Sequence, residues 1–293
     1  MYIDWWIEQI YNLWNLALGD IYVHLTTSPM DFAGGAGWDI AQRVHDALGG
    51  IAYGLLLLFF LLSFFRTVND IQNMTMQQII GWILRFVVVK GLIDASMLIL
   101  GLLVGISMEA NTLILENGVA FVGQGGLPPE VAAAIAAVQE GTALNMIGAF
   151  FQQIPMLFLT MGLGLVVLVC GIIMTIVVYM RFFKVFIYTA ISPLPLSTFA
   201  SPDTAQTGIH FLKSYAAVCL EICVIALAIV IFNALVSDNT LLFNSWNYVG
   251  GDDPNSEFWG TIINWLFGMV IKSILLVSCV IGANRMIDKM LGA

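Results

Sequence analysis

The sequence predicts an all-α, polytopic membrane protein, and three observations lead to this fold class. Hydrophobic residues make up 60% of the 293 residues, and the mean hydropathy is +0.92. Charged residues make up only 10%, whereas an average soluble domain has about 25%. Apolar runs long enough to cross a bilayer recur along the chain, so we expect about five transmembrane helices and no separate soluble catalytic domain.

Residues 1–37 are expected to form an amphipathic segment outside the membrane. Between Ile3 and Val23, apolar residues recur at helical spacing, and acidic and amide residues occupy the other side. The segment is also rich in tryptophan and tyrosine, which favour the headgroup region of a bilayer. A helix that binds a partner protein explains the same pattern equally well. Asp4 and Glu8 without a basic residue do not resemble a cleavable signal peptide, so we expect the mature protein to keep this segment.

Residues 38–293 form the expected transmembrane domain. Its five predicted spans are 48–65, 91–113, 155–179, 211–236 and 258–283. Four glycines, spaced four apart in pairs within the first two spans, predict close contacts between helices: Gly50, Gly54, Gly101 and Gly105.

Two regions between the spans carry further predictions. Residues 79–90 are expected to lie along the membrane, with Lys90 partly neutralised by Asp94 one helical turn later. Residues 116–153 form the expected outside loop. Within it, two prolines followed by the alanine-rich stretch 130–139 predict a short helix.

The stretch 182–205 is predicted to be a re-entrant hairpin that two prolines interrupt. Proline lacks an N–H group and disfavours helical geometry in the residue before it, so Pro193 and Pro195 should break a helix that enters from Val185. Backbone groups freed at bilayer depth must be covered by protein or face a water-filled cavity. We expect the hairpin to lie against neighbouring helices, either as a gate or lining element or as a simple turn between two spans.

The basic residues set the predicted orientation. They cluster at one end of the spans, which the positive-inside rule assigns to the cytoplasm: Arg66, Arg85, Lys90, Arg181, Lys184, Lys213, Arg285 and Lys289. The long connections on the other side carry acidic residues and no lysine or arginine. We therefore expect the N-terminus outside and the C-terminus in the cytoplasm.

Glu221 and Lys272 are the charges deepest within their predicted spans. An ionisable group there costs about 2.5–3.5 kcal/mol on insertion scales, so each needs a partner. The two lie about 17 Å from the cytoplasmic ends of their helices, which predicts an ion pair between the last two spans. The alternatives are that each faces a polar cavity, a neighbouring subunit or an ion pathway.

No recognisable catalytic, cofactor-binding or metal-binding motif occurs in the sequence, so we expect neither an enzyme nor a cofactor. The three histidines are too widely placed to form a metal site. Cys219 and Cys223 share a helical face, but they are expected to act as small packing residues.

The proline hairpin resembles the TrbL-type conjugal transfer proteins, the polytopic inner-membrane component of type IV secretion systems. The matching features are the long span that ends in Arg181 and Lys184, the Ala190-Ile-Ser-Pro-Leu-Pro-Leu196 core, the polar turn 201–205 and the amphiphilic return. The topology expected from the charges agrees with this family. The chain departs from many members in its lack of large terminal extensions and in its compact outside loop.

The resemblance implies a structural component of a DNA-transfer channel. It implies a homo-oligomeric ring, a stalk or pilus subunit outside, ATPases inside, and a translocated complex of DNA and protein. The rival interpretation is a small-solute or ion transporter that uses Glu221, Lys272, Asp94 and the broken helix. An accessory subunit of another membrane complex is a third alternative.

Overall fold

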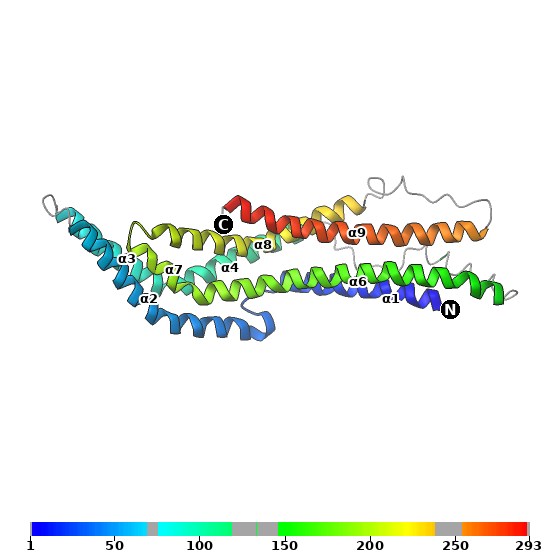
Figure 1. Ribbon diagram of the computed structural model, residues 1–293, viewed down its shortest axis with the longest axis horizontal. Coiled ribbons are helices and arrows are strands. Elements are labelled where there is room, and N and C mark those ends of the chain that lie inside the picture. The colour runs from blue at the N-terminus through cyan, green and yellow to red at the C-terminus, as the bar shows by residue number, and fades with distance from the viewer. Residues whose placement is uncertain (1, 69–75, 119–132, 134–145, 238–253, 292–293) are drawn as a thin grey trace. The chain divides into compact units, whose positions relative to one another are not determined.

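The computed structural model describes residues 2–68, 76–118, 133, 146–237 and 254–291, and all regular structure in these residues is helical (Figure 1). The long helices are α1 (Tyr2–Thr26), α2 (Ala36–Val68), α3 (Met76–Asp94), α4 (Ser96–Glu116), α6 (Met146–Ile191), α8 (Ala205–Ser237) and α9 (Pro254–Leu291). The short ones are η1 (Phe32–Gly35), α7 (Pro193–Ser197) and η4 (Thr198–Ala200).

Five helices in the described residues are long and apolar enough to cross a membrane. They are Phe32–Arg66, Ser96–Glu116, Phe158–Ile191, Ala205–Ala234 and Ile263–Ile287. This result confirms the predicted all-α, polytopic membrane fold. Most of the expected outside loop, including the stretch 130–139, and most of the connection 238–257 lie outside the described residues.

The helices differ from the predicted spans at their ends. α2 begins twelve residues before the predicted span, because Trp38, Ala41 and His45 bury one face of an amphipathic first half. The second predicted span is divided at Ala95, where α3 ends and α4 begins. The hydrogen bonds Ala95 N to Gly91 O and Ile99 N to Ala95 O keep helical spacing across this point, so the chain bends there without a loop.

The chain divides into two compact units. Unit 1 comprises Met1–His24, Ile114–Val178 and Ile225–Gly282, and unit 2 comprises Leu25–Leu113, Tyr179–Val224 and Ala283–Ala293. Helices α6 and α8 contribute residues to both units. The predicted boundary at residue 37 therefore does not separate the N-terminal helix from the membrane helices.

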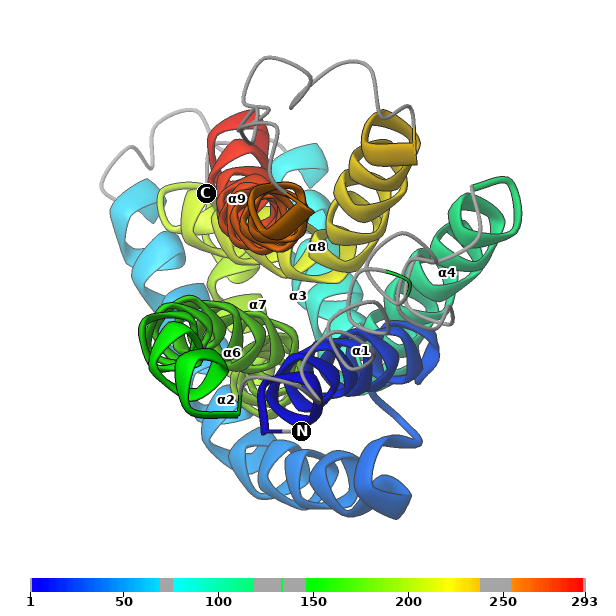
Figure 2. The ribbon, with the colours of Figure 1, turned by 90° about the vertical axis from the view of Figure 1, so that its right-hand side faces the viewer.

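In unit 1, α1 packs along α6 and α9, and Figures 1 and 2 both show α1 beside α6. Its buried residues recur every three or four positions and form one stripe: Ile7, Ile10, Leu18 and Ile21. Where α1 approaches α6, a Cβ atom added at Gly164 would collide with Ile10, and one added at Gly171 would lie 3.3 Å from Ala17 Cβ. Both contacts advance by seven residues, so the two helices run parallel and in register.

The contact with α9 completes the core of unit 1. The Tyr11 ring lies 6.2 Å from the Trp265 ring, and Ile10 belongs to one cluster with Val167, Met269 and Val270. The sequence predicted either a helix at the membrane surface or a helix for a partner protein. The structure instead covers the apolar face of α1 with helices of the same chain.

Unit 2 is built around the antiparallel pair α2 and α3. Side chains from this pair, α7 and η4 form one cluster: Ala52, Leu56, Val89, Ile93, Leu196 and Ala200. A second cluster joins α4, α6 and α8: Leu100, Val104, Val185, Tyr215, Val218 and Cys219. The proline segment therefore belongs to the core of unit 2.

Replacement of Gly164 by valine tests the contact between α1 and α6. The added methyl groups must displace Ile10, and overpacking of this kind typically costs about 1–3 kcal/mol. We expect a lower midpoint of thermal unfolding in detergent than for the wild type.

Gly162→Val is the matched control, because a Cβ atom at Gly162 meets no atom within 4 Å and the change in helix propensity is the same. Equal destabilisation by the two variants would contradict the observed packing of α1.

Candidate functional site

The proline segment continues the helical path of α6 with only a small interruption. α6 runs to Ile191, and Ser192 keeps helical backbone angles, with φ −53° and ψ −35°, before α7 begins at Pro193. The predicted break at the prolines is reduced to a short interruption between α6 and α7, and the chain takes extended backbone angles only at Ser201, with φ −112° and ψ 138°. The predicted hairpin therefore does not begin at residue 182. Proline is tolerated in the first turn of a helix, where an N–H group has no partner within that helix.

A side-chain hydroxyl group donates to a carbonyl that Pro193 leaves open. In an uninterrupted helix the N–H of residue 193 would bond to Thr189 O, and proline cannot supply it. Thr189 O accepts instead from Ser192 Oγ at 2.9 Å and from Ser192 N at 3.4 Å. Further along, Ser197 Oγ donates to Leu194 O and Thr198 Oγ1 donates to Pro195 O, each at 2.6 Å. These hydroxyl groups add local hydrogen bonds on both sides of the prolines.

Protein also covers the segment on the sides where α7 and η4 meet α2 and α3, and Figure 1 shows α7 beside this pair. Pro193, Leu196 and Ser197 are buried. Arg66, near the end of α2, forms an exposed ion pair with Asp203 in the turn that follows η4. The prolines therefore lie in a fixed corner formed by α6, α7 and α8.

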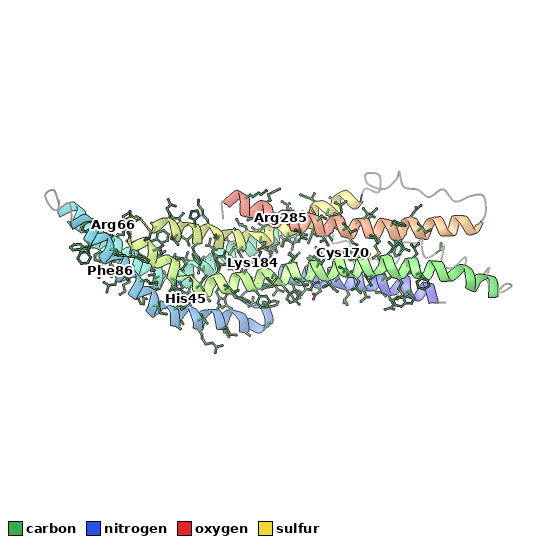
Figure 3. All side chains as sticks on the ribbon, viewed as in Figure 1. His45, Arg66, Phe86, Cys170, Lys184 and Arg285 are labelled. Carbon is green, nitrogen blue, oxygen red and sulfur yellow. The ribbon has the colours of Figure 1, made fainter. Side chains whose placement is uncertain are left out.

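A charged pair joins α6 to α8 inside unit 2. Lys184 Nζ donates to both carboxylate oxygens of Glu221, at 2.9 and 3.0 Å (Figure 3 labels Lys184). The Glu221 side chain is 6% exposed and the Lys184 side chain is 42% exposed. The Lys184 side chain is therefore partly exposed, while its ammonium group neutralises the buried Glu221 carboxylate.

This pair replaces the one that we predicted between Glu221 and Lys272. Lys272 belongs to unit 1, is partly buried, and forms no ion pair with any residue that the structure describes. Depth along each helix suggested the earlier partner, but depth does not tell which face of a helix a residue occupies. Lys184, interpreted from sequence as the cytoplasmic end of a span, instead lies seven residues before the end of α6.

Arg181 lies one turn before Lys184 and is 2% exposed. Its Nη2 atom lies 3.5 Å from Thr27 O, and its guanidinium group lies 4.4 Å from the Phe182 ring centroid. The Phe182 ring stacks on Phe32 at 4.0 Å and 14°. The arginine thus connects α6 to the chain that leaves α1, and its burial was not predicted.

Further buried polar contacts tie α4 to its neighbours. Tyr215 O–H donates to Leu100 O at 3.3 Å, which leaves Thr189 Oγ1 to donate to the tyrosine oxygen at 3.2 Å. Cys223 Sγ contacts Ser107 O at 3.2 Å, and Asn111 Nδ2 donates to Leu25 O at 2.8 Å. These contacts join helices that are distant in sequence, so hydropathy and charge patterns gave no signal for them.

The predicted interaction between Lys90 and Asp94 is not formed among the described residues. Asp94 instead accepts a hydrogen bond from the hydroxyl group of Tyr53 on α2. Nearby, His45 Nε2 contacts Ser96 Oγ at 2.7 Å, and Ser96 Oγ donates to Ile93 O at 2.6 Å. Both contacts hold the bend between α3 and α4 against α2.

The four glycines predicted to mediate helix contacts have different surroundings. A Cβ atom at Gly50, Gly54 or Gly105 would meet nothing within 4 Å, and one at Gly101 would lie 3.3 Å from Met30 Cε. The described part of the chain therefore supplies no close helix contact at the first three positions.

Within the described residues, no group of three or more histidine, cysteine or acidic side chains is arranged to hold a metal ion. Cys170, Cys219 and Cys223 are buried free thiols, and Cys279 is an exposed one. What unit 2 presents is a set of buried polar contacts that fixes the order of helices around the proline corner.

Comparison with known proteins gives no relative for this chain: no family model matches it, and no curated protein matches it.

Ser192→Ala tests whether the Ser192 hydroxyl group replaces the missing N–H group of Pro193. The variant removes the donor to Thr189 O, and we expect a loss of about 1 kcal/mol in stability. In a Pro193→Ala background the new backbone N–H can reach Thr189 O, so Ser192→Ala should cost much less there. A double-mutant cycle with thermal unfolding in detergent measures this difference. Equal costs in the two backgrounds would show that the Ser192 hydroxyl group does not replace the missing N–H group of Pro193.

Exchange of the two charges tests the pair between α6 and α8. Glu221→Ala leaves Lys184 without its carboxylate, and because the lysine is partly exposed we expect a cost of about 1–3 kcal/mol. The double variant Lys184→Glu/Glu221→Lys should recover part of the loss seen in each single variant.

Glu221→Lys/Lys272→Glu serves as the control and should recover nothing. Recovery in that control, without recovery in the exchange of residues 184 and 221, would restore the pair predicted from sequence.

Proposed function

We propose that this chain is a structural membrane component of a conjugative type IV secretion channel, of the TrbL type. In this role it helps to form the path for DNA and protein across the bacterial cytoplasmic membrane. The observation that carries the proposal is the proline corner. The sequence Ala190–Leu196 resembles that family, and the structure gives this segment a fixed, protein-covered conformation suited to a scaffold.

The distribution of charge supports an orientation with the N-terminus outside and the C-terminus in the cytoplasm. The segments of unit 2 contain nine of the ten basic residues and nine acidic residues. The segments of unit 1 contain ten acidic residues and only Lys272, so they account for the net charge of −9. The positive-inside rule then favours the cytoplasmic side for the ends of helices in unit 2.

The proposed partners follow from the same role. A homo-oligomeric ring would surround a path, a stalk or pilus subunit would bind outside, and ATPases would bind inside. The open surroundings of Gly50, Gly54 and Gly105 suit contacts between copies, because small residues let helices approach closely. The acidic segments of unit 1 disfavour tight binding to nucleic acid phosphates, which suits a cargo that passes through.

Lys272 favours a second candidate, a small-solute or ion transporter. This ammonium group is partly buried in a helix of spanning length and forms no ion pair within the described residues. Ionisable groups at such positions often mark ion or substrate pathways. The other residue of this hypothesis, Glu221, is already neutralised by Lys184, which weakens the case for a shared transport site.

The double variant Pro193→Ala/Pro195→Ala tests the function of the corner. The restored N–H groups allow an uninterrupted helix, which would move α7 away from α2 and α3. In cells that carry the conjugative element, we expect transfer to fall by about tenfold or more, equivalent to about 1.4 kcal/mol or more in assembly. The amount of protein in the membrane should not change.

Pro202→Ala is the control, because this proline is exposed in the turn after η4. Unchanged transfer in the double variant would contradict the proposed role. Electron microscopy of the purified protein separates the two candidates: a closed ring supports the channel component, and a monomer or dimer around its own polar cavity supports the transporter.

A further inference from the structure

The outward side of α1 carries a polar stripe beside exposed aliphatic side chains, which include Leu13 (46% exposed) and Leu16 (69% exposed). Glu8, Asn12, Asn15 and Gly19 recur every three or four residues and therefore form a second stripe. Glu8, Asn12 and Gly19 are exposed and Asn15 is partly exposed, and a Cβ atom at Gly19 would meet nothing within 4 Å. The described part of the chain leaves this face open.

The parallel packing in unit 1 fixes the level of this stripe along α6. Ile10 lies at Gly164 and Ala17 lies at Gly171, so Asn12 and Asn15 lie level with the residues between those two glycines. This part of α6 belongs to the stretch Phe158–Met180, which contains no aspartate, glutamate, lysine, arginine or histidine. Its 23 residues extend about 34 Å, close to the ~30 Å thickness of a hydrocarbon core.

The outer face of α6 at this level is apolar. Leu165 is 64% exposed and Ile172 is 51% exposed, and both suit contact with lipid chains. Along one edge, α1 therefore presents amides and a carboxylate at a depth where α6, and the edge of α1 with Leu13 and Leu16, present aliphatic side chains. An ionised carboxylate facing lipid at that depth costs about 2.5–3.5 kcal/mol, so the polar stripe needs water or a polar partner.

We propose that α1 is embedded at bilayer depth and that Glu8, Asn12 and Asn15 line a water-filled path. The proposal rests on the part of the proposed function that gives this protein an aqueous path, and not on the nature of the cargo. Lys272 on α9 adds a second polar group near this depth, because it follows Val270 by two residues and Val270 packs with Ile10.

Thiol labelling of the full chain in intact membranes tests this assignment. Cys279 is first replaced by serine, because it is the exposed native thiol, and the other three cysteines are buried. Asn12→Cys and Gly19→Cys report on the polar stripe, and Leu165→Cys reports on the lipid-facing side of α6 at the same level. A charged methanethiosulfonate and an uncharged, lipid-soluble maleimide are the probes.

We expect the charged reagent to modify the cysteine at position 12 about tenfold faster or more than the cysteine at position 165, because only a hydrated thiol ionises readily. The lipid-soluble reagent should modify both. The cysteine at position 19 should follow the one at position 12, which guards against a folding defect in one variant.

Two results would overturn the assignment. Rapid modification of positions 12 and 165 by the charged reagent would mean that both helices stand in bulk water. Protection of positions 12 and 19 from both reagents would mean that another protein surface covers the stripe. Conjugative transfer is measured separately: its absence in the presence of the expected labelling pattern would reject the cargo and leave the water-filled path intact.

Discussion

The architecture of this protein depends on the need to pair every polar group that enters an apolar interior. With little water available, an unmet carbonyl or charge costs more than most packing contacts return. The chain answers this constraint locally at Ser192, whose hydroxyl serves the carbonyl that Pro193 cannot reach. A long-range example is Glu221 on α8, whose carboxylate pairs with the ammonium group of Lys184 on α6.

These pairings also explain why the helices of unit 2 take one arrangement. Apolar side chains can slide past one another with small changes in energy, whereas a hydrogen bond such as that of Tyr215 to Leu100 O tolerates little displacement. Asn111 donates to Leu25 O near the end of α1, and Arg181 lies close to Thr27 O just after that helix. Polar contacts thus set the register, and apolar burial supplies the bulk of the stability.

The sequence predicted the fold class and five spans, because hydropathy depends on composition and not on which helices meet. It placed a helix break at the prolines, but both are accommodated in the first turn of α7, and the chain turns only after η4, at Ser201. The predicted ion-pair partner of Glu221 was wrong, because a partner on another helix depends on which face of each helix the residues occupy as well as on their depth. Arg181 and Lys184 show a related limit: a cation near the end of an apolar run was interpreted only as a membrane boundary, and here both also form contacts within unit 2.

The parallel packing of α1 on α6 has a consequence for the synthesis of the chain. Ile10 meets Gly164, a residue that follows it by roughly 150 positions. At a synthesis rate of ~5–20 residues per second, the α6 residues that pack against the first helix are synthesised ~10–30 s after it. During that interval its apolar stripe has no partner within the chain, so the nascent protein passes through a stage in which chaperones or the membrane surface must hold its first helix.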